Sequence, residues 1–253
     1  MNDEVDARKQ ELFADHSSRI THDSSHDVHQ RKRIAIYGGT FDPIHTGHLE
    51  VARAVTKLFA IDEFLFVPAR IAPHKLDREV SSPLHRYGML ALATQTDSQL
   101  LISTFELDEA ERRYTVDTLA HFRSQTGTFA DLFFVMGADQ WLEIATWKDW
   151  ERLLTLANII VVTRPGVEFS AGNVGDVVAE SVVDLRGQTH QAAALIRTDP
   201  GSRNIFVTDA VMRDVSATQV RRAARENLNE ELVKLVPPEV ANFIRKYRLY
   251  RSE

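Results

Sequence analysis

The apolar residues of this chain gather in short continuous runs, and segments with helical periodicity lie between these runs. A strand covered on both faces of a parallel sheet is apolar throughout, so the runs predict strands at 34–37, 63–67, 100–104, 132–136, 159–163 and 204–207. Apolar positions at the helical period predict helices at 48–59, 84–96, 115–124, 141–154 and 191–196. This alternation predicts an α/β fold, a doubly wound Rossmann-like parallel sheet with right-handed crossovers.

Two stretches depart from this alternation. Residues 1–30 are polar and have no sustained apolar period, so we expect a disordered leader before a single domain at 31–253. Segment 166–203 has the weakest pattern of the domain, and we expect one or two helices with loops there.

The C-terminal stretch 216–250 predicts helices only, which gives the domain a small C-terminal helical portion. Ser216 is followed three residues later by Gln219, the spacing of a capping box at a helix start. Pro237-Pro238 is expected to open a final helix that ends near Tyr247.

The composition narrows the class of protein. A chain of 253 residues with a formal net charge of −6 disfavours a general binder of nucleic acid or of anionic membranes. The absence of cysteine excludes a disulfide frame and a thiolate nucleophile. Because no apolar run approaches membrane-spanning length and the N-terminus lacks a secretion signal, we expect a cytoplasmic protein.

The most informative stretch is 33–52, RIAIYGGTFDPIHTGHLEVA. It passes from a strand through Gly38 and Gly39 to a helix start that carries His45 and His48. Backbone N–H groups at a helix start form an anion site, and ligands of doubly wound sheets bind at the carboxyl ends of strands. Two imidazoles there predict phosphate binding.

Two alternatives remain open for this histidine pair. One is a divalent metal site that includes Asp42, although zinc sites usually take three or more protein ligands and no nearby residue completes the set convincingly. The other is a helix start whose histidines only cap and pack. The chain has no Walker loop, no G-x-G-x-x-G fingerprint and no G-x-S-x-G elbow.

A second cluster of candidate phosphate ligands lies at the start of the C-terminal helices. Arg221, Arg222 and Arg225 are expected in the first turns of one helix, where cations oppose the helix dipole. A bound anion would remove that conflict. Elsewhere, Gly137 and Asp139 follow a predicted strand, where a glycine permits close approach of a ligand and a carboxylate suits ribose hydroxyls; a plain turn is the alternative.

The stretch GGTFDPIHTGH at 38–48 resembles the signature of the nucleotidyltransferase superfamily, which is related to the H-I-G-H-type aminoacyl-tRNA synthetases. Further segments occur in the order of the bacterial nicotinate-nucleotide adenylyltransferase family, at 67–75, 85–93, 112–119, 133–150, 161–166, 215–221 and 240–250. The resemblance covers residues 33–251, which are read as one nucleotidyltransferase domain.

The resemblance implies adenylyl transfer from ATP to nicotinate mononucleotide, which gives nicotinate adenine dinucleotide and pyrophosphate in NAD biosynthesis. The attacking phosphate is already ionised, so the enzyme has to align the substrates and stabilise charge rather than supply a base. Mg²⁺ would arrive on ATP, with no dedicated metal site. The alternatives are a related adenylyltransferase that acts on phosphopantetheine and a non-catalytic nucleotide-binding regulatory module.

The resemblance also assigns roles residue by residue. The catalytic residues would be His45, His48, Lys75 and Arg221. The ATP-binding residues would be Gly38, Gly39, Thr40, Phe41, His45, His48, Gly137, Asp139, Arg164, Ser216, Thr218 and Arg221. The acceptor-binding residues would be Thr40, Lys75, Thr115, Trp147 and Lys148.

Among the acceptor-binding residues, Trp147 would stack on the pyridine ring, while Thr115 and Lys148 would offer backbone amides to the nicotinate carboxylate. The other two tryptophans of this stretch, Trp141 and Trp150, have no such role, and Trp150 is interpreted as a core residue. The partners expected are small molecules, with no nucleic acid and no membrane; a homo-oligomer is left open.

Overall fold

The structure is a computed structural model, and it describes residues 31–70, 80–108, 113–163, 169–170, 174, 180–187, 203–209 and 215–251. The expected leader and the expected helix at 191–196 lie outside these residues.

The strands of the described residues form one parallel sheet with the order β3-β2-β1-β4-β5-β7-β6. The strands are β1 (Lys32–Gly39), β2 (Glu63–Pro68), β3 (Leu100–Ile102), β4 (Ala130–Gly137), β5 (Asn158–Val162), β6 (Val182–Asp184) and β7 (Ile205–Thr208). Each predicted strand is present, and the prediction of a doubly wound parallel sheet is confirmed.

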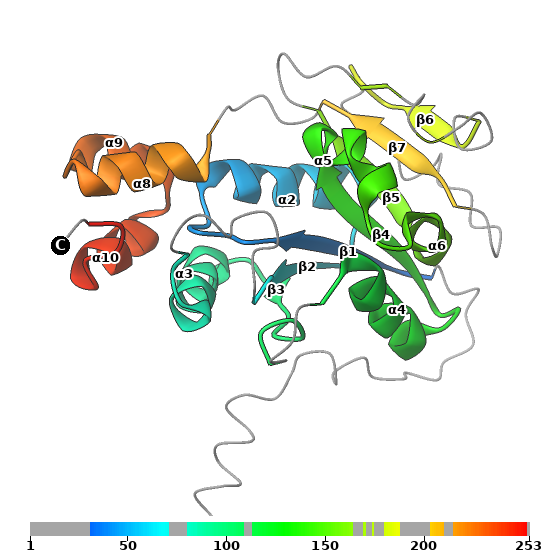
Figure 1. The fold of residues 1–253 in the computed structure, drawn as a ribbon, viewed down its shortest axis with the longest axis horizontal. Helices are drawn as coiled ribbons and strands as arrows, with labels where there is room; N and C mark the ends of the chain where they lie inside the picture. The colour runs from blue at the N-terminus through cyan, green and yellow to red at the C-terminus, as the bar shows by residue number, and fades with distance from the viewer. Residues whose placement is uncertain are drawn as a thin grey trace, which may run out of the picture.

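Helices cover both faces of the sheet (Figure 1). One face carries α2 (Thr46–Phe59), α3 (Pro83–Thr94), α8 (Ala217–Arg225), α9 (Asn229–Leu235) and α10 (Pro238–Lys246). The other face carries α4 (Thr115–Thr126), α5 (Ala138–Leu142), the 3-10 turn η2 (Ile144–Thr146) and α6 (Trp150–Leu156). None of the described helices is long and apolar enough to cross a membrane.

The alternation of side chains along the strands divides the core in two. In β1, Ala35 and Tyr37 pack in the cluster under α2, whereas Ile34 and Ile36 pack in the cluster under α4. Because β1 and β4 are neighbours whose following helices lie on opposite faces, the carboxyl ends of these two strands form a topological switch point. Figure 1 shows α8, α9 and α10 gathered beside the start of α2, at this end of the sheet.

Two of the predictions about secondary structure are wrong. The continuous helix expected at 141–154 is divided into α5, η2 and α6, because Trp147 has an extended backbone and Asp149 a left-handed one with φ 50°. Segment 166–203 was expected to hold helices and loops, yet its described part includes strand β6. A three-residue strand is too short to produce a recognisable period.

The helical portion at the C-terminus agrees with its prediction. The Ser216 side chain accepts from the Gln219 backbone N–H at 3.3 Å, and Gln219 Oε1 accepts from the Ser216 N–H at 2.8 Å, which completes the capping box. Helix α10 begins at Pro238 and is capped at Tyr247.

Candidate active site

The turn after β1 is shaped by a phenylalanine ring. Phe41 has a left-handed backbone with φ 48° and is buried, and its ring lies across Gly39. A Cβ added to Gly39 would lie 2.9 Å from Phe41 Cζ, so no larger residue fits without moving that ring. Phe41 can therefore serve a ligand through its backbone, while its side chain packs the turn.

Three carbonyl oxygens of this turn accept hydrogen bonds from the protein. Gly39 O accepts from the backbone N–H of Ala69 at 2.9 Å. Thr40 O accepts from Arg86 at 2.7 Å, and Asp42 O accepts from Arg221 at 2.7 Å. In a planar trans peptide the C=O and N–H point to opposite sides. The N–H groups of the Gly39–Thr40 and Thr40–Phe41 peptides therefore point away from Ala69 and Arg86.

The predicted histidine pair is brought together at the start of α2. The rings of His45 and His48 stack with centroids 3.6 Å apart. His48 Nδ1 accepts a hydrogen bond from the His45 backbone N–H at 3.3 Å, so neutral His48 carries its proton on Nε2. His45 is only 3% exposed, whereas His48 is half-buried. His48 is therefore the more accessible donor, and His45 supports its ring.

The glycine between these histidines has a steric reason. A Cβ at Gly47 would lie 3.2 Å from His45 Nδ1 and 3.4 Å from the carbonyl oxygen of Val215. Val215 stands directly before the N-cap of α8, so the N-termini of α2 and α8 meet at Gly47. Two helix N-termini in contact add their positive dipole ends at one place, which favours an anion there.

Asp42, the carboxylate of the metal alternative, has a partner from the C-terminal segment. Its buried carboxylate accepts a hydrogen bond from the Tyr250 hydroxyl at 2.8 Å. Among the residues that the structure describes, no group of three or more His, Cys, Asp or Glu is placed to hold a metal ion.

Only one of the three clustered arginines lies near the start of α8. Arg222 and Arg225 fall in its last turn, where cations complement the helix dipole, and Arg222 pairs with Glu231. The expectation that all three crowd the first turns is therefore wrong, because the helix is only nine residues long. Arg221 spans Asp42 O and the Thr218 hydroxyl, the latter at 3.0 Å, and thus links the two helix starts.

The Gly137 and Asp139 pair lies at the carboxyl end of β4, beside the end of β1. A Cβ on Gly137 would collide with the Asp139 carboxylate, which folds back over it. Asp139 is exposed at the start of α5. The structure thus gives this glycine a steric role and leaves an accessible carboxylate next to the β1 turn.

Three of the predicted acceptor residues, Thr115, Trp147 and Lys148, lie on the opposite face of the sheet from α2. Thr115 is the first residue of α4. Lys148 Nζ lies 3.5 Å from Asp117 Oδ2 and 4.3 Å from the centre of the Tyr114 ring, which brings it to the same helix start. Trp147 is half-buried with its ring edge-on to Phe134.

Of the remaining tryptophans, Trp141 is fully buried and donates to Ser170 O at 3.1 Å, so it is a core residue. Trp150 is partly buried and packs against the same core cluster. The predicted ligands Lys75 and Arg164 lie outside the described residues.

Sequence reasoning missed Arg86 and Glu106. Arg86 shares a helical face with Met89, Leu90 and Ala93, and an arginine within such an apolar stripe was the available signal. Glu106 accepts from the Thr118 hydroxyl at 2.6 Å, and burial raises the pKa of its carboxyl. No pattern in the sequence distinguished Glu106 from Asp108, an exposed acid two residues later.

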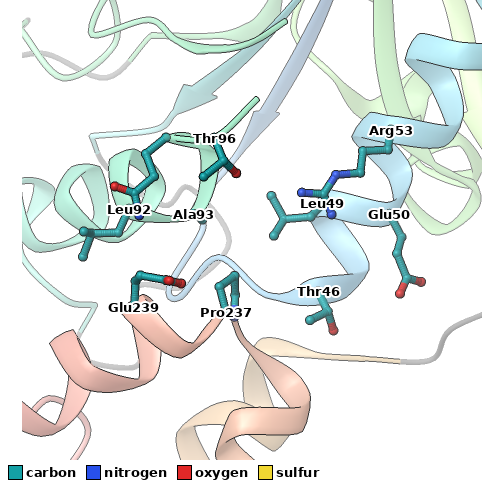
Figure 2. A pocket seen from close by; sticks show the side chains of 10 residues that line it. Thr46, Leu49, Glu50, Arg53, Leu92, Ala93, Thr96, Pro237 and Glu239 are labelled. Carbon is teal, nitrogen blue, oxygen red and sulfur yellow. The ribbon is translucent and has the colours of Figure 1, made fainter. Parts of the chain in front are cut away.

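A hollow lined by described residues lies elsewhere on α2. It has a volume of about 270 Å³ and lies between α2, the end of α3 and the start of α10 (Figure 2). Its lining consists of Thr46, Leu49, Glu50, Arg53, Leu92, Ala93, Gln95, Thr96, Pro237 and Glu239. None of the predicted nucleotide or acceptor ligands lines it, so the site is defined by the converging strand and helix ends instead.

Comparison with known proteins agrees with this geometry. A family model described as Cytidylyltransferase-like matches residues 36–223. A relative from Thermoanaerobacter sp. (strain X514), named "Probable nicotinate-nucleotide adenylyltransferase", is 38% identical over 221 residues, which are 87% of this chain and 95% of the relative. A relative of the same name from Chromobacterium violaceum is 36% identical over 220 residues, 87% of this chain and 99% of the relative.

Solved structures share the fold. The Plasmodium falciparum nicotinic acid mononucleotide adenylyltransferase complexed with APC has a TM-score of 0.63 at 20% identity, and the match covers 87% of this chain and 97% of that one. The same enzyme complexed with NaAD gives the same TM-score, identity and coverage.

Proposed function

The chain belongs to the nicotinate-nucleotide adenylyltransferase family, and we propose that its site transfers the adenylyl group of ATP to nicotinate mononucleotide. The products are nicotinate adenine dinucleotide and pyrophosphate, a step of NAD biosynthesis. The observation that carries the proposal is the meeting of two helix N-termini at Gly47, where His48 presents its Nε2–H.

The chemistry requires charge stabilisation more than proton transfer. A phosphate oxygen of the acceptor attacks the α-phosphorus of ATP and forms a new P–O bond. The bond from the α-phosphorus to the oxygen that bridges it to the β-phosphorus breaks, and pyrophosphate leaves. Because the nucleophile is already ionised, the site has to orient two anions and spread the charge that develops between them. Fixed N–H donors and helix dipoles supply this without reorganising during the reaction.

The phosphate-binding roles follow from the directions of these donors. His48, the turn N–H groups of Thr40 and Phe41, and the backbone at Gly38 and Gly39 contact the α-phosphate, and buried His45 orients His48. Arg221, Ser216 and Thr218 bind the outgoing pyrophosphate, together with Lys75. The Ser216 oxygen accepts a hydrogen bond from the α8 cap, and its own O–H remains able to donate to a phosphate.

The two ends of the dinucleotide occupy the neighbouring strand ends. Asp139 and Gly137 contact the adenosine, with Arg164 as a further ligand. Trp147 stacks on the pyridine ring, Thr115 and Lys148 offer backbone amides to its carboxylate, and Thr40 contacts the acceptor phosphate. These assignments are supported by the placement of the β4 end beside β1 and of Lys148 beside the start of α4.

Mg²⁺ is proposed to enter on the phosphates of ATP. Magnesium keeps several waters and binds through substrate phosphates with few protein ligands. The ion would supply additional neutralisation of the leaving pyrophosphate. The phosphate-facing donors of this chain, which are imidazole, hydroxyl, guanidinium and backbone N–H groups, suit phosphate oxygens rather than the cation itself.

We further propose that the enzyme acts in the cytoplasm on these two small molecules and not on nucleic acid. The net charge of −6 supports this choice, because it repels a polyanion while the local helix dipoles still attract a nucleotide.

The test is pyrophosphate release from ATP with three acceptors: nicotinate mononucleotide, nicotinamide mononucleotide and phosphopantetheine. We expect nicotinate mononucleotide to give the highest kcat/KM. Release with phosphopantetheine alone would assign the chain to a related transferase. No release with any acceptor, together with retained ATP binding, would identify a regulatory module.

A further inference from the structure

A buried arginine, which is not among the proposed substrate ligands, donates hydrogen bonds to the backbone of the β1 turn. Arg86 is 1% exposed, and its guanidinium donates to the carbonyl oxygens of Thr40 at 2.7 Å, Ser81 at 3.0 Å and Arg70 at 3.2 Å. A buried guanidinium that donates to three backbone carbonyls fixes the main chain at three points. One of these points is the peptide whose N–H belongs to Phe41.

The C-terminal end of the chain reaches the same turn. The Tyr250 hydroxyl donates to Asp42 Oδ1 at 2.8 Å and lies 4.0 Å from Met89 Sδ. Burial, and next the charge of Asp42, raise the pKa of Tyr250 far above its ordinary value, so the phenol remains a protonated donor at every working pH. The hydroxyl thus provides a permanent partner for a carboxylate that is 2% exposed.

Both sides of this contact have an unusual backbone. Phe41, next to Asp42, has φ 48°, and Tyr250 has φ 66°. Residues other than glycine seldom adopt left-handed conformations, which persist where surrounding contacts fix them. The hydrogen bonds from Arg86 and Tyr250 are contacts of this kind, and they hold the turn in a shape that the isolated chain would leave.

The turn is mechanically linked to the proposed donor. The Phe41 ring packs edge-on against His48, with centroids 5.1 Å apart, and Arg221 is bonded to Asp42 O. A shift of the turn therefore moves the Phe41 N–H, the His48 imidazole and Arg221 together. A displacement of about 1 Å in such a constellation lowers turnover by as much as 10²-fold.

We propose that Arg86 and Tyr250 are positioning residues for adenylyl transfer, which hold the β1 turn so that its N–H groups and His48 meet the α-phosphate. The inference rests on the proposed function and extends the working site to the last residues of the chain. The guanidinium of Arg86 and the hydroxyl of Tyr250 are bonded to the protein itself, so their loss should reduce alignment and leave acceptor binding intact.

A matched control for Arg86 lies at the opposite end of the strands. Arg123 also donates to backbone carbonyls, those of Leu156, Gly127 and Ala130. Ala130 is the first residue of β4, at the amino end of the strand, whereas the site is at the carboxyl end. Burial lowers the pKa of both guanidinium groups, so the two arginines are alike in their bonding to backbone carbonyls, while Arg123 is only partly buried and lies at the other end of the strands.

The first experiment compares Arg86→Lys with Arg123→Lys by thermal unfolding, steady-state kinetics and ATP titration calorimetry. Both variants replace a guanidinium, which donates to several carbonyls, by a single ammonium group, and both should unfold at a lower temperature than the wild type. Loss of a whole transition-state donor lowers kcat by about 10²–10³-fold, and a displaced donor should cost part of that. We therefore expect kcat to fall by about tenfold or more in Arg86→Lys. In Arg123→Lys it should change by less than about twofold. Equal kcat losses in both variants would overturn the proposal.

The second experiment removes one oxygen atom. Tyr250→Phe deletes the donor to Asp42, and Tyr247→Phe deletes the hydroxyl of a ring that is 49% exposed and packs on Phe243. We expect Tyr250→Phe to lower kcat by about fivefold to tenfold, with an unchanged KM for the acceptor, because alignment and not acceptor binding is lost. Wild-type kcat in Tyr250→Phe, or an equal loss in Tyr247→Phe, would refute the role of Tyr250.

ATP binding separates this inference from the proposed function. If the acceptor panel identified a different acceptor, Arg86→Lys should still weaken ATP binding by calorimetry while Arg123→Lys leaves it unchanged. If nicotinate mononucleotide is not used as an acceptor but only Arg86→Lys weakens ATP binding, the proposed acceptor is rejected and the positioning role stands. If the panel confirms nicotinate mononucleotide but neither kcat nor ATP binding distinguishes Arg86→Lys from Arg123→Lys, the proposed function stands and the positioning role is rejected.

Discussion

At the phosphate side of the site, the proposed donors are held by buried contacts: His45 is 3% exposed and stacks on His48, and Arg221 is anchored on Asp42 O. At the acceptor side, Lys148 is 52% exposed and reaches only a half-exposed carboxylate and a tyrosine ring. Transition-state charge demands fixed donors, whereas ground-state binding tolerates mobile ones. We therefore expect phosphate-side substitutions to lower kcat and acceptor-side substitutions to raise the acceptor KM.

The largest expected effect is that of His48→Ala. It removes the Nε2–H that is proposed to bind the α-phosphate, so kcat should fall by about 10²–10³-fold, the cost of one preorganised donor. His85→Ala is the control, because His85 packs on Tyr247 and has no proposed ligand. Steady-state kinetics with both substrates saturating measure the difference. A His48→Ala kcat close to that of the wild type would remove the distinction between the two sides.

Arg221→Ala should follow, with Arg222→Ala as its neighbour control. Arg221 links Thr218 to the β1 turn, and its loss should lower kcat/KM for ATP by about 10–10²-fold, as for a charged hydrogen bond worth ~1.5–3 kcal/mol. Arg222 makes a surface ion pair with Glu231, so its loss should cost at most about 1 kcal/mol of stability and no activity. An equal loss of kcat/KM in Arg221→Ala and Arg222→Ala would mean that phosphate binding depends on the total positive charge and not on the position of Arg221.

Trp147→Ala tests the acceptor side. Loss of a stacking ring should raise the KM for nicotinate mononucleotide by about 5–10-fold, since one aromatic contact contributes roughly 0.5–1.5 kcal/mol beyond burial. The KM for ATP should stay nearly constant. Trp150→Ala removes a partly buried indole from the same core cluster without a proposed ligand. If both substrates lose affinity equally in Trp147→Ala, the stacking role is wrong.

Lys148→Ala should have the smallest effect. The ion pair with Asp117 is exposed on both sides, and such pairs contribute about 0–1 kcal/mol. Because the proposed contact uses the backbone amide, the acceptor KM should change by less than about threefold. Differential unfolding and the acceptor KM are the measurements. A tenfold rise in KM would show that the ammonium group itself binds the acceptor.

The sequence predicted the sheet well because every long strand is a buried apolar run. It also placed the turn and both histidines at the carboxyl end of a strand and predicted the capping box of α8, since strand ends and capping boxes are local signals. The division of 141–154 was not predictable, because no proline or glycine marks it and an aspartate gives no sequence signal for the left-handed conformation of Asp149. Strand β6 was missed because it is three residues long.

Within the site, the sequence could not show which groups support and which groups contact the ligand. His45 and His48 are equivalent in the motif, and only burial and the Nδ1 hydrogen bond separate them. Arg86 and Tyr250 reach the β1 turn from 46 and 208 residues away, counted from Thr40 and Asp42. Contacts over such distances carry no local pattern.

A crystal structure with a non-hydrolysable ATP analogue tests the central claim most directly. The account predicts His48 Nε2 at about 2.7–3.2 Å from an oxygen of the α-phosphate, with the phosphates lying between the starts of α2 and α8. A nucleotide bound with its phosphates outside hydrogen-bonding reach of His48 and of the β1 turn would contradict it.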